Sequence, residues 1–401
     1  MKKFTLRPYQ QEAADAAVAF LKDPKEKGNG LIVLATGLGK SLVAAEIANQ
    51  LNSDVLVFCP SKEILEQNYR KMKTYTDDCS MYSASVGKKE ISKITFATIG
   101  SVKNTKSFFE HFEYIIVDEC HLCDPSVGMY RMFFDYMGRK IIGMTATPYR
   151  LVTTGQRYNF KERKMDLSNA ESRLIPIVGE GQLFSKVVYN IDTEYALKQG
   201  YLANLRYFDV RSDDMKKCTI FPNTSGAEFS ERSLQWMEEH TDFYNHMVSI
   251  IKRLQNPKNG RKRNGILCFV RLTEVAQLMT TQIDNCRLVT GKTPKKEREQ
   301  ILKDFADRKF DVLLNVNCLA VGYDRPDLDT VLLGCPTMSL ARYYQELGRA
   351  IRPYKDKEGW IIDLGGNVKR FGEVHKLKFR QNGFGEWDVY NDVRKLTNVK
   401  L

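Results

Sequence analysis

The chain has 401 residues, of which 43% are apolar and 27% charged, and its formal net charge is +12 at pH 7. This length suits two or three domains with real cores. The basic excess favours a nucleic-acid binder, because phosphates attract Lys and Arg and release counterions, although an ordinary basic protein could carry the same charge.

Targeting segments and metal-binding patterns are weak in this sequence. Residues 1–10 have no apolar segment after the two lysines, and no apolar run approaches the length of a membrane span. Cys120 and Cys123 have CxxC spacing, but no second pair completes a zinc site. Nine cysteines without a regular framework fit a reducing cytoplasm, so we expect a cytoplasmic protein with no membrane partner.

The first 150 residues alternate between continuous apolar runs, typical of buried parallel strands, and helical stretches. The predicted strands are Leu31–Leu34, Val55–Cys59, Ile94–Thr98, Tyr114–Val117 and Ile141–Met144, and the predicted helices are Ser41–Leu51, Lys62–Lys73 and roughly Val127–Tyr136. This pattern predicts a doubly wound α/β layer.

The alternation stops near Arg150 and resumes after residue 205. Residues 151–190 show little periodicity, and we interpret them as an insertion or linker. A second α/β domain then follows, with predicted strands Tyr207–Val210, Ile266–Val270, Arg287–Val289, Asp311–Leu314, Thr330–Leu333 and Trp360–Leu364, and helices Leu234–Leu254, Thr273–Ile283, Lys295–Ala306 and Ser339–Gly348. The last 30 or so residues are polar and carry no recognisable motif.

A phosphate-binding loop is predicted where the first strand meets its helix. Thr36, Gly37 and Gly39 lie in the turn, and Lys40 and Ser41 open the helix. Backbone N–H groups of such a turn bind phosphate oxygens, a lysine reaches the β- and γ-phosphates, and a hydroxyl ligates Mg²⁺. Leu34 stands where the usual pattern has Gly or Ala.

Two adjacent carboxylates follow the apolar strand Tyr114–Val117. Asp118 is placed to hold Mg²⁺ through water, and Glu119 to orient and deprotonate the attacking water. Together with the lysine loop, they predict that the protein binds a nucleoside triphosphate with Mg²⁺ and hydrolyses it.

Nine segments then occur in the order of the helicase superfamily 2 motifs: LRPYQQEA, LATGLGKS, FCPSKEILEQ, FATIGSV, VDECH, MTATPYR, ILCFV, LLNVNCLAVGYDRP and YQELGRAIRP. Over roughly residues 5–372 the chain resembles DEAD/DEAH (DExH, DECH-box) motors. It is similar to phage and prophage helicases, and to the branch-migration, XPB-like and restriction-motor ATPases.

The resemblance implies two tandem RecA-like P-loop domains with an ATP cleft between them. The expected divisions are residues 1–150 for the first domain, 151–205 for the insertion or linker, 206–370 for the second domain and 371–401 for a tail. It also implies adenine recognition by Gln10, with Arg7 and Tyr9 supporting the base, and a bacterial or phage-infected host cell.

Further roles come from the same resemblance. His121, Thr145 and Thr147 would couple the nucleotide site to the nucleic-acid groove, and Gly322 and Asp324 would lie near the ribose. Arg349 and Arg352 would act as arginine fingers, with Gln345 beside them. We expect residues 345, 349 and 352 to share one helix face, from which an Arg could stabilise charge on the γ-phosphate.

The predicted grip on nucleic acid is less specific. Family members contact the sugar-phosphate backbone at positions matching Ser61, Lys62, Thr98, Gly100, Arg271, Thr290 and Asn317. Such contacts carry no base code, and a structural role is as good an interpretation for each. The basic loop Lys258–Arg263 either adds attraction or is a solvated turn.

We therefore expect an ATP-dependent helicase or translocase, with DNA favoured over RNA. Three alternatives stay open: the motor subunit of a restriction or defence complex, an ATP-dependent switch that acts without unwinding, and an RNA helicase. The sequence motifs do not indicate the direction of movement along a strand or the oligomeric state.

Overall fold

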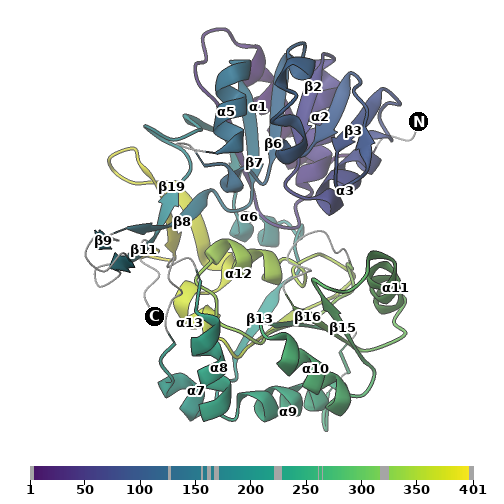
Figure 1. Cartoon of the computed structure of the whole chain (residues 1–401), viewed down its shortest axis with the longest axis vertical. Coiled ribbons are helices and arrows are strands. Elements are labelled where there is room, and N and C mark those ends of the chain that lie inside the picture. Colours follow the sequence, from purple (N-terminus) through teal and green to yellow (C-terminus); the bar gives the residue numbers. More distant parts are fainter. Residues whose placement is uncertain are drawn as a thin grey trace. The chain divides into compact units, whose positions relative to one another are not determined.

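The computed structural model describes residues 4–124, 128–154, 157–159, 164–166, 171–220, 228–260, 262–263, 265–316 and 325–396 (Figure 1). The chain forms two compact units. Unit 1 comprises residues 1–150, 176–196 and 379–388, and unit 2 comprises residues 151–175, 197–378 and 389–401. Each unit contains one large, mainly parallel sheet, which confirms the predicted α/β class with two sheets.

The sheet of unit 1 has the strand order β12-β1-β7-β6-β2-β5-β3-β4, in which only the β3–β4 pair is antiparallel among the described pairings. Its strands are β1 (Gly30–Leu34), β2 (Val55–Phe58), β3 (Cys79–Ser83), β4 (Lys88–Lys89), β5 (Ile94–Ala97), β6 (Tyr114–Asp118), β7 (Ile141–Thr145) and β12 (Lys186–Ile191). The five strands predicted in the first 150 residues are all present, because fully buried parallel strands read as uninterrupted apolar runs.

Helices cover both faces of this sheet. They are α1 (Pro8–Lys22), α2 (Lys40–Leu51), α3 (Lys62–Met72), α4 (Ile99–Val102) and α5 (Met129–Met137), with 3₁₀ turns η1 (Lys106–Phe109) and η2 (Cys120–Leu122). Phe133 and Phe134 of α5 pack with Phe58 and with neighbouring strand residues in one buried cluster. Cys120 and Cys123 belong to the same cluster, so the CxxC pair is part of the core.

The sheet of unit 2 is parallel, in the order β13-β18-β17-β14-β16-β15. Its strands are β13 (Leu205–Asp209), β14 (Ile266–Val270), β15 (Cys286–Thr290), β16 (Val312–Val316), β17 (Thr330–Leu333) and β18 (Gly359–Asp363). The helices that accompany it are α7 (Asp213–Lys217), α8 (Glu231–His240), α9 (Phe243–Gln255), α10 (Thr273–Gln282), α11 (Lys295–Ala306), α12 (Leu340–Leu347) and α13 (Asn367–Phe371), with the 3₁₀ turn η3 (Val374–Lys376).

One prediction of a single continuous helix is wrong. The stretch expected to be helical from Leu234 to Leu254 is two helices, α8 and α9, separated at Thr241 and Asp242. Thr241 is extended, and its hydroxyl donates to Met237 O at 2.7 Å, so the side chain competes with the continuing helix. Asp242 then occupies the N-cap position of α9.

Strands also form where the sequence shows little periodicity. Beyond β7 these are β8 (Tyr149–Thr154), β9 (Arg157–Asn159), β10 (Lys164–Asp166) and β11 (Glu171–Pro176), followed by helix α6 (Thr193–Lys198), and near the carboxyl end β19 (Leu377–Gln381), β20 (Trp387–Asn391) and β21 (Arg394–Lys395). β12, in the segment expected to be insertion or linker, pairs with β1. Among the described residues no helix is long and apolar enough to cross a bilayer.

Candidate active site

The phosphate loop lies between β1 and α2. Gly37 and Gly39 have φ angles of 91° and 77°, in the left-handed region that residues with a side chain rarely adopt. A Cβ atom at Gly39 would lie 2.6 Å from Nε2 of Gln10. The loop therefore needs glycine at this position for two reasons, its backbone conformation and the close approach of α1.

Two side chains of α1 hold the loop from outside. Tyr9 Oη and Gln10 Nε2 each donate to the carbonyl of Leu38 at 2.9 Å. The backbone N–H of Arg7 donates to Gln10 Oε1, also at 2.9 Å. Gln10 is buried and thus fixed between the start of α1 and the phosphate loop, the part of the site where the resemblance implies that an adenine is read.

The two predicted carboxylates lie at the end of β6. Asp118 is its last residue, and Glu119 follows with φ 50°, a left-handed conformation that turns the chain into η2. Glu119 Oε1 is 3.4 Å from Nζ of Lys40. The structure thus brings the lysine of the phosphate loop and the second carboxylate together, although nearly eighty residues separate them.

A chain of polar contacts continues from Glu119 to β7. Glu119 Oε2 lies 3.4 Å from His121 Nδ1, and that nitrogen hydrogen-bonds Thr145 Oγ1 at 2.9 Å. The backbone N–H of Thr147 donates to the same hydroxyl at 2.9 Å. His121, Thr145 and Thr147, the residues predicted to couple the two sites, are buried and in contact with each other.

The environments of the two carboxylates differ. Burial, and then the negative charge of Glu119, raises the pKa of Asp118 above its ordinary value. Burial acts in the same direction on Glu119, but Lys40 and His121 outweigh it and lower the pKa of Glu119 to about 2. Glu119 is therefore ionised at neutral pH, the state that a proton acceptor requires.

Helix α3 contributes two residues that sequence reasoning missed. Asn68 Nδ2 donates to Asp118 Oδ2 at 2.9 Å, and Asn68 is 2% exposed, so it fixes the first carboxylate from behind. Lys71 Nζ contacts the hydroxyl of Ser41. The helical spacing of 68 and 71 puts both on the face of α3 toward the site, but no sequence signal separates them from other polar helix residues.

The residues of unit 1 predicted to contact nucleic acid follow the carboxyl ends of the adjacent strands β2 and β5. Thr98 Oγ1 hydrogen-bonds the hydroxyls of Ser83 and Ser101, each at 3.0 Å. Lys62 Nζ donates to Ser85 O at 2.9 Å. Ser61 caps α3, and a Cβ at Gly100 would meet open space. The serines complete a hydroxyl cluster that the sequence did not reveal.

The corresponding residues of unit 2 are only partly described. Arg271 directly follows β14, and Thr290 ends β15, both at carboxyl ends of strands in the same sheet. The backbone N–H of Thr290 donates to Thr293 Oγ1 at 2.9 Å. Asn317, Gly322 and Asp324 lie outside the described residues.

The prediction that residues 345, 349 and 352 share one helix face is wrong. Gln345 lies on α12, but the helix ends at Leu347, so Arg349 is in a turn and Arg352 in a bend beyond it. Gly348 is the C-cap of α12, and Pro353 disfavours helical backbone at Arg352, the residue before it. Arg352 is largely buried, which lowers its pKa to about 10 and still leaves it charged at neutral pH.

Buried acids organise the surroundings of α12. Glu346 is 2% exposed and its Oε1 accepts from Arg342 Nε at 2.8 Å. Glu228 accepts from the backbone N–H of Met338 at 2.8 Å and from Thr337 Oγ1 at 2.6 Å, and its Oε2 lies 3.8 Å from Nη1 of Arg271. Glu228 therefore links Arg271 to the segment that enters α12, a role that its isolated position in the sequence did not suggest.

Comparisons with known proteins agree with this arrangement. Residues 3–150 match the family described as "Type III restriction enzyme, res subunit", and residues 245–354 match "Helicase conserved C-terminal domain". The DNA 3'-5' translocase XPB2 of Sulfurisphaera tokodaii is 26% identical over 388 residues, which cover 90% of this chain and 82% of that protein.

Two solved structures share the fold. One is the ATP-dependent Type ISP restriction-modification enzyme LlaBIII bound to DNA, with a TM-score of 0.64 and 19% identity over 91% of this chain, which spans only 28% of that enzyme. The other is S. cerevisiae Dbp5 bound to RNA and ADP BeF3, with a TM-score of 0.53 and 13% identity over 90% of this chain and 89% of the other.

The chain belongs to the superfamily 2 helicases, ATP-dependent helicases and translocases built on two RecA-like sheets. It is accordingly an ATPase, and its relatives include the XPB translocases and a Lactococcus phage protein that is 24% identical over 82% of this chain.

Proposed function

We propose that this protein is a DNA-dependent ATPase that moves along or remodels DNA, and that unit 1 holds ATP with Mg²⁺. The contacts that run from Lys40 through Glu119 and His121 to Thr145 carry the proposal. They link the lysine of the phosphate loop to a partly buried carboxylate and then to a neighbouring strand, an arrangement that suits coupling between hydrolysis and another site.

The residues present fit a bound nucleotide. Gly37 and Gly39 add no side chains to the loop before α2, and the N–H groups at the start of that helix favour anions. Ser41 and Asp118 supply a hydroxyl and a carboxylate, which are ligands that Mg²⁺ accepts. Bound Mg²⁺ would neutralise phosphate charge during transfer.

We assign a separate role to each residue around the nucleotide. Lys40 binds phosphate oxygens, and its ion pair with Glu119 keeps that carboxylate ionised and aimed at the site. Glu119 orients a water and accepts its proton. Asn68 holds Asp118 in one orientation by its 2.9 Å hydrogen bond. Arg7, Gln10 and Thr36 would contact the rest of the nucleotide at the loop.

Unit 2 supplies the remaining groups in this proposal. Arg349 and Arg352 would act as arginine fingers from the turn after α12, with Gln345 on the helix and Gly322 and Asp324 near the ribose. If arginine fingers from the second domain contact ATP, bound ATP favours a closed state of the two domains. Hydrolysis then removes these contacts and the domains reopen. We retain residues 1–150 and 206–370 as the two domains of this cycle.

Two observations support DNA as the partner. The net charge is +12, and the similar proteins include a DNA 3'-5' translocase and a restriction-modification enzyme bound to DNA. The hydroxyl cluster around Thr98, with Ser61, Lys62 and Gly100, and the residues Arg271, Thr290 and Asn317 suit contacts to a sugar-phosphate backbone without a base code. A bacterial or phage-infected cytoplasm is the proposed location.

Two displacement assays test the mode of action. Strand displacement on forked DNA reports unwinding, and displacement of a third strand from a triplex reports movement along intact duplex. We expect ATP-dependent activity in at least one, absent in Lys40→Ala. Inactivity in both, with active ATPase, would favour the switch that acts without moving, or a motor that needs a further subunit.

A further inference from the structure

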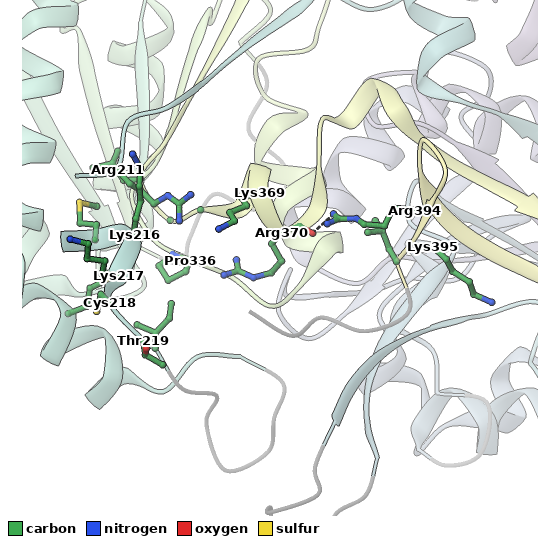
Figure 2. Close-up of a pocket in the computed structure, with 17 residues that line it drawn as sticks. Arg211, Lys216, Lys217, Cys218, Thr219, Pro336, Lys369, Arg370, Arg394 and Lys395 are labelled. Carbon is green, nitrogen blue, oxygen red and sulfur yellow. Dashed lines mark hydrogen bonds between the residues drawn. The ribbon is translucent and has the colours of Figure 1, made fainter. Parts of the chain in front are cut away.

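A cavity of about 560 Å³ lies in unit 2, and none of its lining residues is assigned above to nucleotide or nucleic acid. It forms where the chain leaves β13 and β18, with Pro336 and the carboxyl-terminal strand β21 completing its walls (Figure 2). Its volume is within the range typical of ligand pockets. We call it the basic pocket, because seven of its lining residues are Lys or Arg and none is Asp or Glu.

Three of these cations face a common space. In Figure 2 the side chains of Arg211, Lys369 and Arg370 point toward one another beside Pro336, whereas Lys395 points away. Lys369 is exposed, and it has no ion-pair partner among the described residues. Asp209 pairs with Arg211, and Asp363 and Glu228 act on Arg370, so Lys369 is the cation of the three that is left for an added anion.

The two arginines are held in place before any ligand arrives. Asp209 accepts from Arg211 Nε at 2.9 Å and from Nη2 at 2.7 Å, a two-point contact that fixes the plane of the guanidinium. Arg370 Nη1 donates to Thr337 O at 3.0 Å, and its guanidinium lies 5.0 Å from the ring of Phe229. Burial lowers the pKa of Arg370 to about 10, a shift that a bound anion would oppose.

A glycine turn brings the cations close together. Gly366 has φ 68°, and a Cβ there would lie 2.5 Å from Nη1 of Arg211. The N–H groups of Gly365 and Val368 already donate to Asp363, at 3.0 and 2.8 Å. The side-chain cations, not these amides, are therefore what the turn offers to a ligand.

We propose that the basic pocket binds the phosphodiester backbone of a nucleic-acid strand, outside the predicted motif contacts. This inference rests on the proposed function for the identity of the polyanion. Guanidinium groups match phosphate geometry, and lysine adds a mobile point charge. Cations from three separate segments, residues 211–217, 369–370 and 394, line the cavity, which suits a chain of phosphates better than one small ion.

The first test measures binding of a labelled single-stranded and a labelled duplex DNA by anisotropy, without nucleotide, over a series of salt concentrations. Lys369→Glu should weaken binding about tenfold at low salt and reduce the slope of log K against log salt by about one to two. The matched control is Lys25→Glu, an exposed lysine before the amino end of β1. It should behave like the wild type, and basal ATPase should be unchanged in both.

A second variant and a competition assay define the ligand. Arg211→Gln should also weaken DNA binding, and inorganic phosphate should not displace DNA at concentrations near those of the labelled strand. If Lys369→Glu and Arg211→Gln bind DNA like Lys25→Glu, the inference is wrong. It is equally wrong if these variants lose only affinity for inorganic phosphate.

This experiment separates the inference from the proposed function. Binding is measured without ATP, so DNA affinity that depends on Lys369 supports the pocket even if DNA fails to stimulate the ATPase. Conversely, DNA could stimulate the wild-type ATPase while Lys369→Glu binds DNA with the wild-type salt slope. That result would refute the proposal for the basic pocket and leave the proposed function standing.

Discussion

Lys40 and Glu119 form an ion pair, with Nζ and Oε1 3.4 Å apart. Lys40 opens α2 after the phosphate loop, and Glu119 follows β6 in a left-handed conformation. The pair lowers the pKa of Glu119 against the effect of burial. A bound triphosphate would compete for Lys40, so the lysine that we propose binds phosphate also lowers the basicity of Glu119.

Glu119→Gln should retain ATP binding and lose turnover. Glutamine keeps the size of the side chain but cannot accept the proton of the attacking water, so kcat should fall about 10² to 10⁴-fold. Steady-state ATPase and binding of a fluorescent ATP analogue measure the two effects. Normal turnover in this variant would overturn the assignment of Glu119 as the base.

Asn68→Ala should impair Mg²⁺-dependent hydrolysis. Loss of the 2.9 Å hydrogen bond frees the carboxylate of Asp118, and loss of such outer contacts typically costs 10 to 100-fold in metal affinity or activity. The Mg²⁺ concentration for half-maximal ATPase should rise. Glu63→Ala, an exposed change on the same helix, is the control, and an equal effect in both would mean a general loss of α3 stability.

Arg352→Ala should lower kcat more than ATP affinity, because a finger acts on charge that develops during phosphoryl transfer. A loss on the order of 10³-fold is expected for such an arginine. Arg352→Lys keeps a positive charge without the planar fork and should recover only part of the rate. An unchanged kcat in Arg352→Ala would remove this residue from the finger role.

Asp363 should give unit 2 a pH-dependent stability. Burial raises the pKa of Asp363 from 3.8 to about 6 in the folded chain. Between these values the folded chain holds a proton that the unfolded chain has released, so the contribution of this carboxyl to stability increases as pH falls from about 6 toward 4. The unfolding free energy of the wild type minus that of Asp363→Asn should therefore increase as pH falls from about 6 toward 4, and a decrease in that quantity would contradict the sign.

The sequence predicted the strands that flank the nucleotide site because burial on both faces leaves an unbroken apolar run, as in β1 and β6. It also predicted which residues would meet there, since Lys40 and Glu119 follow strands of one parallel sheet. It could not assign Asn68, whose hydrogen bond to Asp118 joins residues fifty positions apart. Such a contact depends on the packing of α3.

Two other features could not be predicted from the sequence for related reasons. Helix α12 ends at Leu347 with Gly348 as its C-cap, an end that the helical spacing of residues 345, 349 and 352 concealed. The basic pocket combines residues near 211, 336, 366 and 394, and no one of these segments is unusually basic. Charge that gathers only through folding has no signature along the chain.

The central claim is that DNA controls ATP hydrolysis at the site of Lys40 and Glu119. The most direct measurement is the steady-state ATPase rate without nucleic acid and with single-stranded DNA, duplex DNA, forked DNA and RNA, beside Lys40→Ala. We predict strong stimulation by at least one form of DNA, weaker stimulation by RNA, and no activity in Lys40→Ala. Stimulation by RNA alone, or none by any nucleic acid, would contradict a DNA motor.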